Sequence, residues 1–195
     1  MARAGLTPER VAEAAADMAD SVGLENVTIS ALARSFGVAD ASLYSHVKNL
    51  RDLRVRVAFR AASDFADRLT AAVAGRAGRD ALIAFANAYR AFALEHPGRY
   101  AATNIEIDPE VSARSTGGAR IIEATTAVFR AYGLGDPDLT DAIRLVRSTF
   151  HGYASLEAIG AFRDPRDVQA SWERGVNALA TLLENWPSYA ADQRA

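Results

Sequence analysis

One short segment of the chain, GVADASLYSHVKNLRDL at residues 37–53, concentrates side chains that can bind nucleic acid. Tyr44, His46 and Lys48 lie within five residues of one another, and Lys48 is the only lysine in the chain. Between residues 43 and 60 there are five basic side chains and a single aspartate. Phenol, imidazole and ammonium groups donate hydrogen bonds to phosphate oxygens and base edges. This local positive charge predicts a DNA-binding surface, although the whole chain carries a net charge of −2.

Two short helices are expected ahead of this segment. The pair Thr7-Pro8 is typical of a helix start, with the threonine as N-cap, and Gly23 ends the apolar stripe that follows. Thr28 is expected to cap a second helix, ISALARSF, whose apolar residues turn inward. Gly37 then ends this helix, because glycine readily adopts the left-handed conformation of a C-terminal cap.

A third short helix is expected to begin with Asp40 or Ser42 as its N-cap and to continue to about residue 47. Leu43 and Val47 lie on one side of it and are expected to anchor it on the second helix. The side chains at its start are short, as a helix that enters the major groove requires. Three short helices with a glycine turn between the second and third predict a helix-turn-helix unit.

The joined pattern of these helices resembles the TetR (tetracycline-repressor-like) family of transcriptional regulators. The resemblance rests on T-x-x-x-L-A-x-x-x-G-V from Thr28 to Val38 and S-L-Y-x-H-V-K-N from Ser42 to Asn49. It covers about residues 7–60 closely and the rest of the chain loosely. It implies that double-stranded DNA is a partner and that the contacts come from the starts of the second and third helices: Thr28, Ser30, Asp40, Ala41, Ser42, Tyr44, Ser45, His46 and Lys48.

Asp40 departs from what a DNA-binding surface normally carries. A carboxylate repels phosphate unless it accepts a hydrogen bond, for example from cytosine N4. The simpler interpretation is that Asp40 only caps the third helix. Tyr44 has a second interpretation too, because its ring can pack on the next helix while its hydroxyl reaches a phosphate.

The remainder predicts an all-α protein with two domains. Asn49 is expected to cap a long helix of roughly 25 residues, and we place the boundary inside it, giving a DNA-binding domain at 1–55 and an effector-binding and dimerisation domain at 56–195. The last two helices are expected at about 139–162 and 167–186. The first of these carries two apolar stripes, which indicates burial on both sides and favours a homodimer formed by these two helices over a monomer with a thick core.

The family resemblance also implies an unidentified small-molecule effector that releases a repressor from a palindromic operator. Aromatic and polar residues mix in the second domain, although an aromatic stripe is more often core than pocket. Phe150, His151 and Gly152 resemble the Trp-His-Gly motif of one TetR subgroup, with phenylalanine in place of tryptophan. The candidate effector contacts are Tyr89, Phe92, Tyr100, Asn104, Phe129, Phe150, His151, Tyr153 and Glu157.

Other classes of function find little support in the sequence. The three histidines lie far apart, there is no cysteine, and no glycine-rich nucleotide loop is present. We therefore expect no enzyme, no metal and no cofactor. A helical adaptor that binds only protein would leave the cluster from Tyr44 to Lys48 unexplained. No apolar run is long enough to span a bilayer, so a cytoplasmic protein without a membrane partner is expected.

Overall fold

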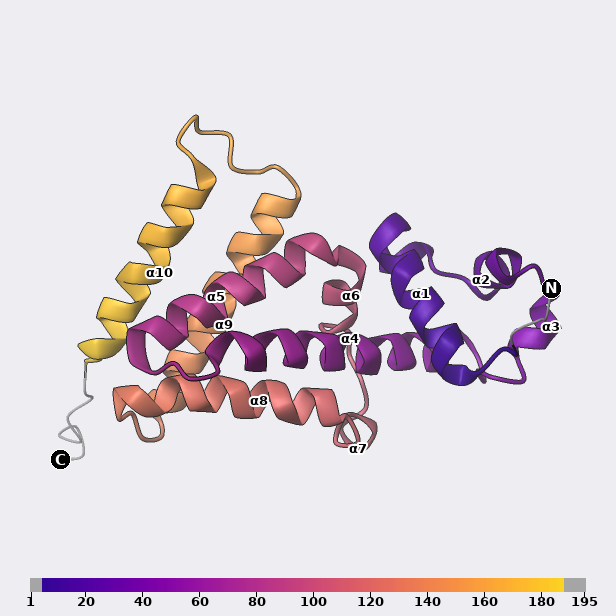
Figure 1. Ribbon diagram of the computed structural model, residues 1–195, viewed down its shortest axis with the longest axis horizontal. Coiled ribbons are helices and arrows are strands. Elements are labelled where there is room, and N and C mark those ends of the chain that lie inside the picture. Colours follow the sequence, from indigo (N-terminus) through magenta and orange to yellow (C-terminus); the bar gives the residue numbers. More distant parts are fainter. Residues whose placement is uncertain (1–4, 188–195) are drawn as a thin grey trace, which may run out of the picture. The chain divides into compact units, whose positions relative to one another are not determined.

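The computed structural model describes residues 5–187, which form ten α-helices and two short 3-10 helices (Figure 1). Within that range there is no β-strand, and the predicted all-α fold class is confirmed. The chain divides into two compact units. The first contains the described residues up to Asp67 together with Glu95–Arg120, and the second contains Arg68–Leu94 together with the described residues from Ile121. The functional boundary near residue 55 stays a prediction.

The first unit begins with α1 (Pro8–Val22), and the predicted signals for its two ends are confirmed. The Thr7 side chain accepts a hydrogen bond of 3.2 Å from the Arg10 amide. Gly23 ends the helix with φ of 89°, a value that residues with a Cβ rarely adopt. After the 3-10 turn η1 (Leu24–Asn26), α2 (Ile29–Phe36) starts at the cap predicted for it, because Thr28 accepts from the Ala31 amide at 3.1 Å. Gly37 ends α2 in the left-handed region.

The third helix is shorter than predicted. α3 covers only Asp40–Leu43, its N-cap is Ala39, and no side chain caps it, so the expected cap at Asp40 or Ser42 is wrong. Tight turns follow, in which the His46 and Val47 amides both donate to the Leu43 carbonyl, at 2.8 and 3.0 Å.

The long helix α4 (Leu50–Val73) has 24 residues, close to the predicted length, and spans about 36 Å. Asn49 caps it as expected, since its side chain accepts from the Asp52 amide at 2.9 Å. The Asp52 carboxylate reaches back and accepts from the Lys48 amide at 3.0 Å. These two bonds fix the corner between α3 and α4.

The core of the first unit combines residues from both of its segments. Leu32, Leu43 and Val47 are almost completely buried in it, as predicted for the helix-turn-helix unit. Ala102 of α6 (Pro97–Ala102) is fully buried in the same cluster. Ile105 and Ile107, which follow α6, pack against this cluster and are partly buried. The segment after residue 95 is therefore part of the core that supports the helix-turn-helix unit.

Gly98 lets α6 lie directly against α1 (Figure 1). A Cβ added at this position would stand only 2.0 Å from the carbonyl carbon of Ala19 and 2.4 Å from the Asp20 nitrogen. Both neighbours belong to the backbone of α1, so no side-chain rotation could make room for it. The two helices consequently approach closely enough for the next residue, Arg99, to reach several carboxylates.

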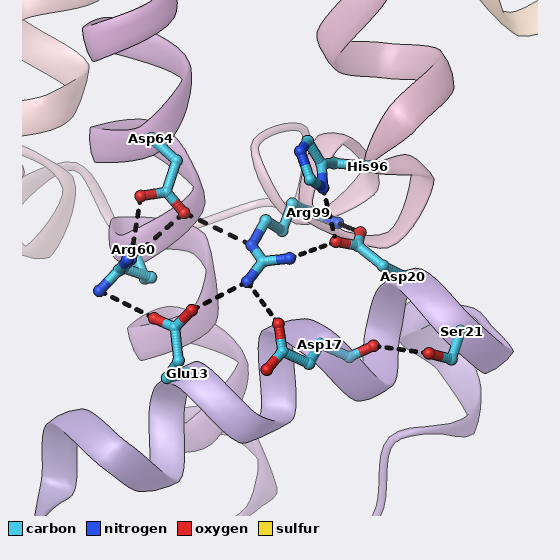
Figure 2. A network of polar contacts seen from close by, with 8 residues as sticks. All are labelled: Glu13, Asp17, Asp20, Ser21, Arg60, Asp64, His96 and Arg99. Atoms are coloured by element: carbon cyan, nitrogen blue, oxygen red, sulfur yellow. Dashed lines mark hydrogen bonds and ion pairs between the residues drawn. The ribbon is translucent and has the colours of Figure 1, made fainter.

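Arg99 is the centre of a polar cluster, here called the Arg99 network, which joins α6 to α1 and α4 (Figure 2). Only 9% of its side chain is exposed. Its guanidinium donates to two carboxylates of α1, Asp17 at 2.8 Å and Glu13 at 3.1 Å, and forms an ion pair with a third, Asp20. The Arg99 Nε atom also lies 3.4 Å from the Asp64 carboxylate of α4. Asp20 holds the Arg99 amide as well, at 2.7 Å. Two further residues complete the network: His96, 3.1 Å from Asp20, and Arg60, which pairs with Glu13 and Asp64.

Arg99 stays charged in this setting. Burial lowers the pKa of its guanidinium, but the hydrogen bonds to Asp17 and Asp20 outweigh burial and raise that pKa above its ordinary value. A buried cation with several carboxylate partners stabilises a structure only while all of them remain together.

The helix predicted from Glu110 to Tyr132 is divided into three pieces in the structure. They are α7 (Pro109–Ser112), α8 (Thr116–Phe129) and the 3-10 turn η2 (Arg130–Tyr132). The break arises because Ser115 caps a new helix, its hydroxyl accepting from the Gly118 amide at 3.1 Å. Gly117 then packs closely on α4, where an added Cβ would stand 2.5 Å from the Ser63 nitrogen.

The second unit contains α5 (Gly78–Glu95), α9 (Asp138–Ala158) and α10 (Val168–Glu184), with most of α8. α9 ends before the predicted residue 162, because the chain turns at Gly160 with φ of 65°. Asp167 is the N-cap of α10, and its carboxylate accepts from the Ala170 amide at 2.7 Å. No helix in the described part of the chain has the length and apolar character needed to cross a bilayer.

Candidate nucleic-acid interface

Most of the residues predicted to contact DNA are exposed, and the set is here called the contact face. It runs from the start of α2 to the corner before α4. Tyr44 keeps 56% of its surface exposed, whereas Leu43 and Val47, which lie on either side of it in sequence, are 0% and 2% exposed. Eight members of the contact face are exposed and His46 is half-buried: Thr28, Ser30, Asp40, Ala41, Ser42, Tyr44, Ser45, His46 and Lys48.

Several members of the contact face also hold local structure together. Thr28 is the N-cap of α2, and the Ser45 hydroxyl donates to the Ser42 carbonyl at 2.8 Å. The Ser30 hydroxyl donates to the Asp40 carboxylate and so ties the first turn of α2 to the first residue of α3. Sequence reasoning placed both residues at the surface but missed this bond, because ten residues separate them and no local pattern encodes the pairing.

The positive charge behind the contact face is smaller than the sequence suggests. Arg56 is paired with Asp52 at 3.0 Å, and Arg60 with Glu13 at 2.8 Å. Both arginines are therefore engaged in intramolecular ion pairs. Burial raises the pKa of Asp52, but hydrogen bonds from the Lys48 amide and Arg56 outweigh burial and lower that pKa below its usual value. The Asp52 carboxylate is therefore ionised at neutral pH.

The candidate effector contacts fall into both compact units. Tyr100 and Asn104 belong to the first unit, where the Tyr100 ring packs edge-on against Phe65 at 6.3 Å. The Asn104 amide donates to the Tyr100 carbonyl at 2.9 Å. The other seven lie in the second unit: Tyr89, Phe92, Phe129, Phe150, His151, Tyr153 and Glu157.

An aromatic cluster in the second unit brings three of those seven together. Phe150 lies 5.6 Å from Tyr89 and 5.4 Å from Trp172, measured between ring centroids. Tyr153 lies 4.9 Å from Trp172, and its hydroxyl donates to the Val168 carbonyl at 3.0 Å. Trp172 was not among the predicted contacts.

Next to this cluster, Arg90 forms a bidentate ion pair with Glu157, in which both N–O distances are 2.6 Å. The Arg90 guanidinium also lies 5.4 Å from the centre of the Trp172 ring. Phe92 and Phe129 are buried elsewhere in the second unit, while His151 is on the exposed side of α9. The roles of these residues toward an effector stay predictions.

Comparisons with known proteins define the class of this molecule. The HTH-type transcriptional regulator Rv0681 of Mycobacterium tuberculosis is 38% identical over 185 residues, which cover 93% of this chain and 83% of that protein. The HTH-type transcriptional regulator YobS of Bacillus subtilis is 30% identical over 94% of this chain and 96% of its own length. The protein is therefore a DNA-binding transcriptional regulator with a helix-turn-helix unit, and not an enzyme.

The family follows from the second part of the chain. Residues 82–179 match the tetracyclin repressor-like C-terminal domain, and the chain belongs to the TetR family of transcriptional regulators. Two solved structures share its fold. BioQ bound to its double-stranded DNA operator has a TM-score of 0.64 at 22% identity, over 93% of this chain and 99% of that one. A TetR variant from Acinetobacter baumannii in complex with minocycline has a TM-score of 0.68 at 20% identity, over 94% and 99%.

Proposed function

We propose that this regulator is a ligand-responsive repressor, which binds a palindromic operator as a homodimer and is released by a small-molecule effector. The observation that carries the proposal is the contact face. Its polar side chains are exposed except for the half-buried His46, whereas Ile29, Leu43 and Val47, which lie between them in sequence, are buried. Tyr44 and Lys48 contact phosphates, and the residues at the start of α3 meet base edges. BioQ, a protein of the same fold, is bound to a DNA operator in its own structure.

The homodimer uses the outer sides of α9 and α10. Along α9, Val146 and Phe150 are buried while Leu145 and Leu156 remain 38% and 45% exposed. On α10, Leu182 is 38% exposed, and the residues before it on the same side, Gly175 and Ala178, are small and exposed. Exposed leucines next to small residues allow helices from two copies to pack closely.

The effector binds within residues 56–195, and residues 1–55 bind DNA. The effector site involves the polar members of the candidate set, with His151 and Glu157 first among them. A ligand shifts the protein away from its operator only if it binds the released conformation more tightly than the DNA-bound one. The minocycline complex of the related fold supports a small molecule as the signal.

Selection of bound duplexes from a random pool tests the operator. We expect enrichment of a palindrome whose half-sites lie about 34 Å apart, one turn of the DNA helix. Placed over a promoter, the enriched sequence should lower transcription in vitro when the protein is added. Enrichment of a single asymmetric site, or of nothing, would contradict the proposal.

Tyr44→Ala is expected to weaken binding to the enriched operator about tenfold, and to weaken binding to unrelated duplexes by the same factor. The loss is uniform because a phosphate contact carries no sequence information. Titration by fluorescence anisotropy measures both affinities. Tyr44→Phe is the matched control, since it keeps the ring and removes only the hydroxyl. Unchanged affinity in both variants would remove Tyr44 from the contact face.

Leu156→Glu combined with Leu182→Glu is expected to convert the protein into a monomer, because carboxylates would then face each other across an apolar interface. Light scattering after size exclusion measures the mass. Ile122→Glu serves as control, because Ile122 is 69% exposed but lies on α8. A dimer that survives the double substitution would exclude this surface as the interface.

A further inference from the structure

The bond between Ser30 and Asp40 occupies an unusual position on the contact face. It joins α2 to α3, and both side chains are exposed. Within residues 5–187, the Ser30 hydroxyl is the hydrogen-bond donor to the Asp40 side chain, and no cation forms an ion pair with that carboxylate. A carboxylate with no cation beside it opposes the approach of phosphates. Asp40 therefore weakens binding to DNA in general unless a donor on the DNA meets it.

The direction of this hydrogen bond decides which donor can do so. A serine hydroxyl has a single proton, and here that proton points to Asp40. Both side chains then offer only acceptors to the DNA: the second carboxylate oxygen of Asp40 and the lone pairs of the Ser30 oxygen. Ala41, the next residue on α3, adds no polar atom.

A surface that has only acceptors discriminates among the bases in the major groove. Guanine presents two acceptors there, N7 and O6, and thymine presents the O4 acceptor, so both are repelled. Adenine presents an N6 donor next to the N7 acceptor, and N7 would face an acceptor. Cytosine presents the N4 amino group as a donor and has no acceptor in that groove. The pair of side chains thus matches cytosine better than any other base.

We propose that Ser30 and Asp40 together read a cytosine in each half-site of the operator, with the Asp40 carboxylate accepting from N4. Ser30 acts as a positioning residue: its hydroxyl donates to the Asp40 carboxylate, so it has no proton left to donate to a base. This inference rests on the operator binding proposed above. It makes Asp40 a residue that determines sequence specificity rather than affinity.

The test compares selection from the same random pool by the wild-type protein and by Asp40→Asn. We expect the wild-type operator to contain a C·G pair at one symmetric position, preferred roughly 5- to 150-fold over the other pairs. Asparagine still accepts from Ser30 but also offers an amide donor, so preference at that position should move to A·T, because asparagine pairs with adenine N6 and N7. All other positions should keep their bases.

Two further variants separate this role from a structural one. Ser30→Ala should lower the preference for cytosine at the same position, whereas Ser35→Ala, which removes a hydroxyl bonded within the same helix but outside the contact face, should leave it unchanged. The inference is overturned if Asp40→Asn enriches the wild-type operator unaltered, or if its affinity changes by one factor for all sequences. A wild-type protein that enriches no operator would overturn the proposed function, and this inference with it.

Discussion

Arg99→Met is expected to lower the free energy of unfolding by about 3 kcal/mol, because it leaves the carboxylates of the Arg99 network without their shared cation. The loss of the cation affects Asp20 most, since only 14% of its side chain is exposed and its carboxylate accepts from both the guanidinium and the backbone amide of Arg99. Methionine nearly preserves the volume of the arginine stem, so the loss reports on charge rather than on a cavity. Denaturation by urea, followed by circular dichroism, measures the change.

The matched control is Arg144→Met on α9. Arg144 is 77% exposed and lies 3.8 Å from Asp141, which is typical of a surface pair that contributes between 0 and about 1 kcal/mol. The stability of Arg99→Lys should be intermediate, because an ammonium restores the charge but not the planar set of guanidinium donors. Equal stability of Arg99→Met and Arg144→Met would mean that the network contributes nothing to the fold.

Gly98→Ala is expected to destabilise the first unit by about 3 kcal/mol or more, although it adds only one methyl group. The added carbon would meet the Ala19 carbonyl carbon at 2.0 Å and the carbonyl oxygen at 2.1 Å, and both belong to a helix backbone that cannot rotate away. α6 must therefore shift from α1, which also lengthens the bonds from Arg99 to that helix. The melting temperature measures the combined loss.

Gly135→Ala provides the comparison for that substitution. Its added carbon would meet nothing within 4 Å, and Gly135 does not have a positive φ, so the effect should stay within about 0.5 kcal/mol. Because Gly98→Ala and Gly135→Ala make the same chemical change, their difference isolates the contact between the two helices. Similar melting temperatures would show that α6 can move away from α1 without loss.

The sequence was sufficient to predict structure that depends on neighbouring residues. Thr7, Thr28 and Asn49 cap the helices that they were expected to cap, since a cap contacts amides two or three residues away. The alternation of buried Leu43 and Val47 with exposed residues followed from helical spacing in the same way. These local rules were enough to identify the helix-turn-helix unit and its exposed face.

The features that were missed depend on contacts between distant residues. Arg99 meets Asp17 and Asp20 about 80 positions away, and nothing in the segment HPGRY indicates which carboxylates it will find. The break before α8 depends on Ser115 as a cap and on Gly117 packing against α4. Tyr100 and Asn104 belong to a different compact unit from Phe150, a division that no local pattern encodes, and their role toward an effector stays a prediction.

The order in which the first unit is assembled from the chain has a consequence for synthesis on the ribosome. Its core needs Ala102, yet residues 68–94, which belong to the second unit, are translated in between. A nascent chain that has emerged only to residue 67 still lacks Arg99 to neutralise the acidic side of α1, and it exposes the apolar surface that Ala102 will cover. The DNA-binding part of this regulator thus becomes complete only after Ala102 and the residues around it have been made, which limits how early a partly synthesised copy can occupy an operator.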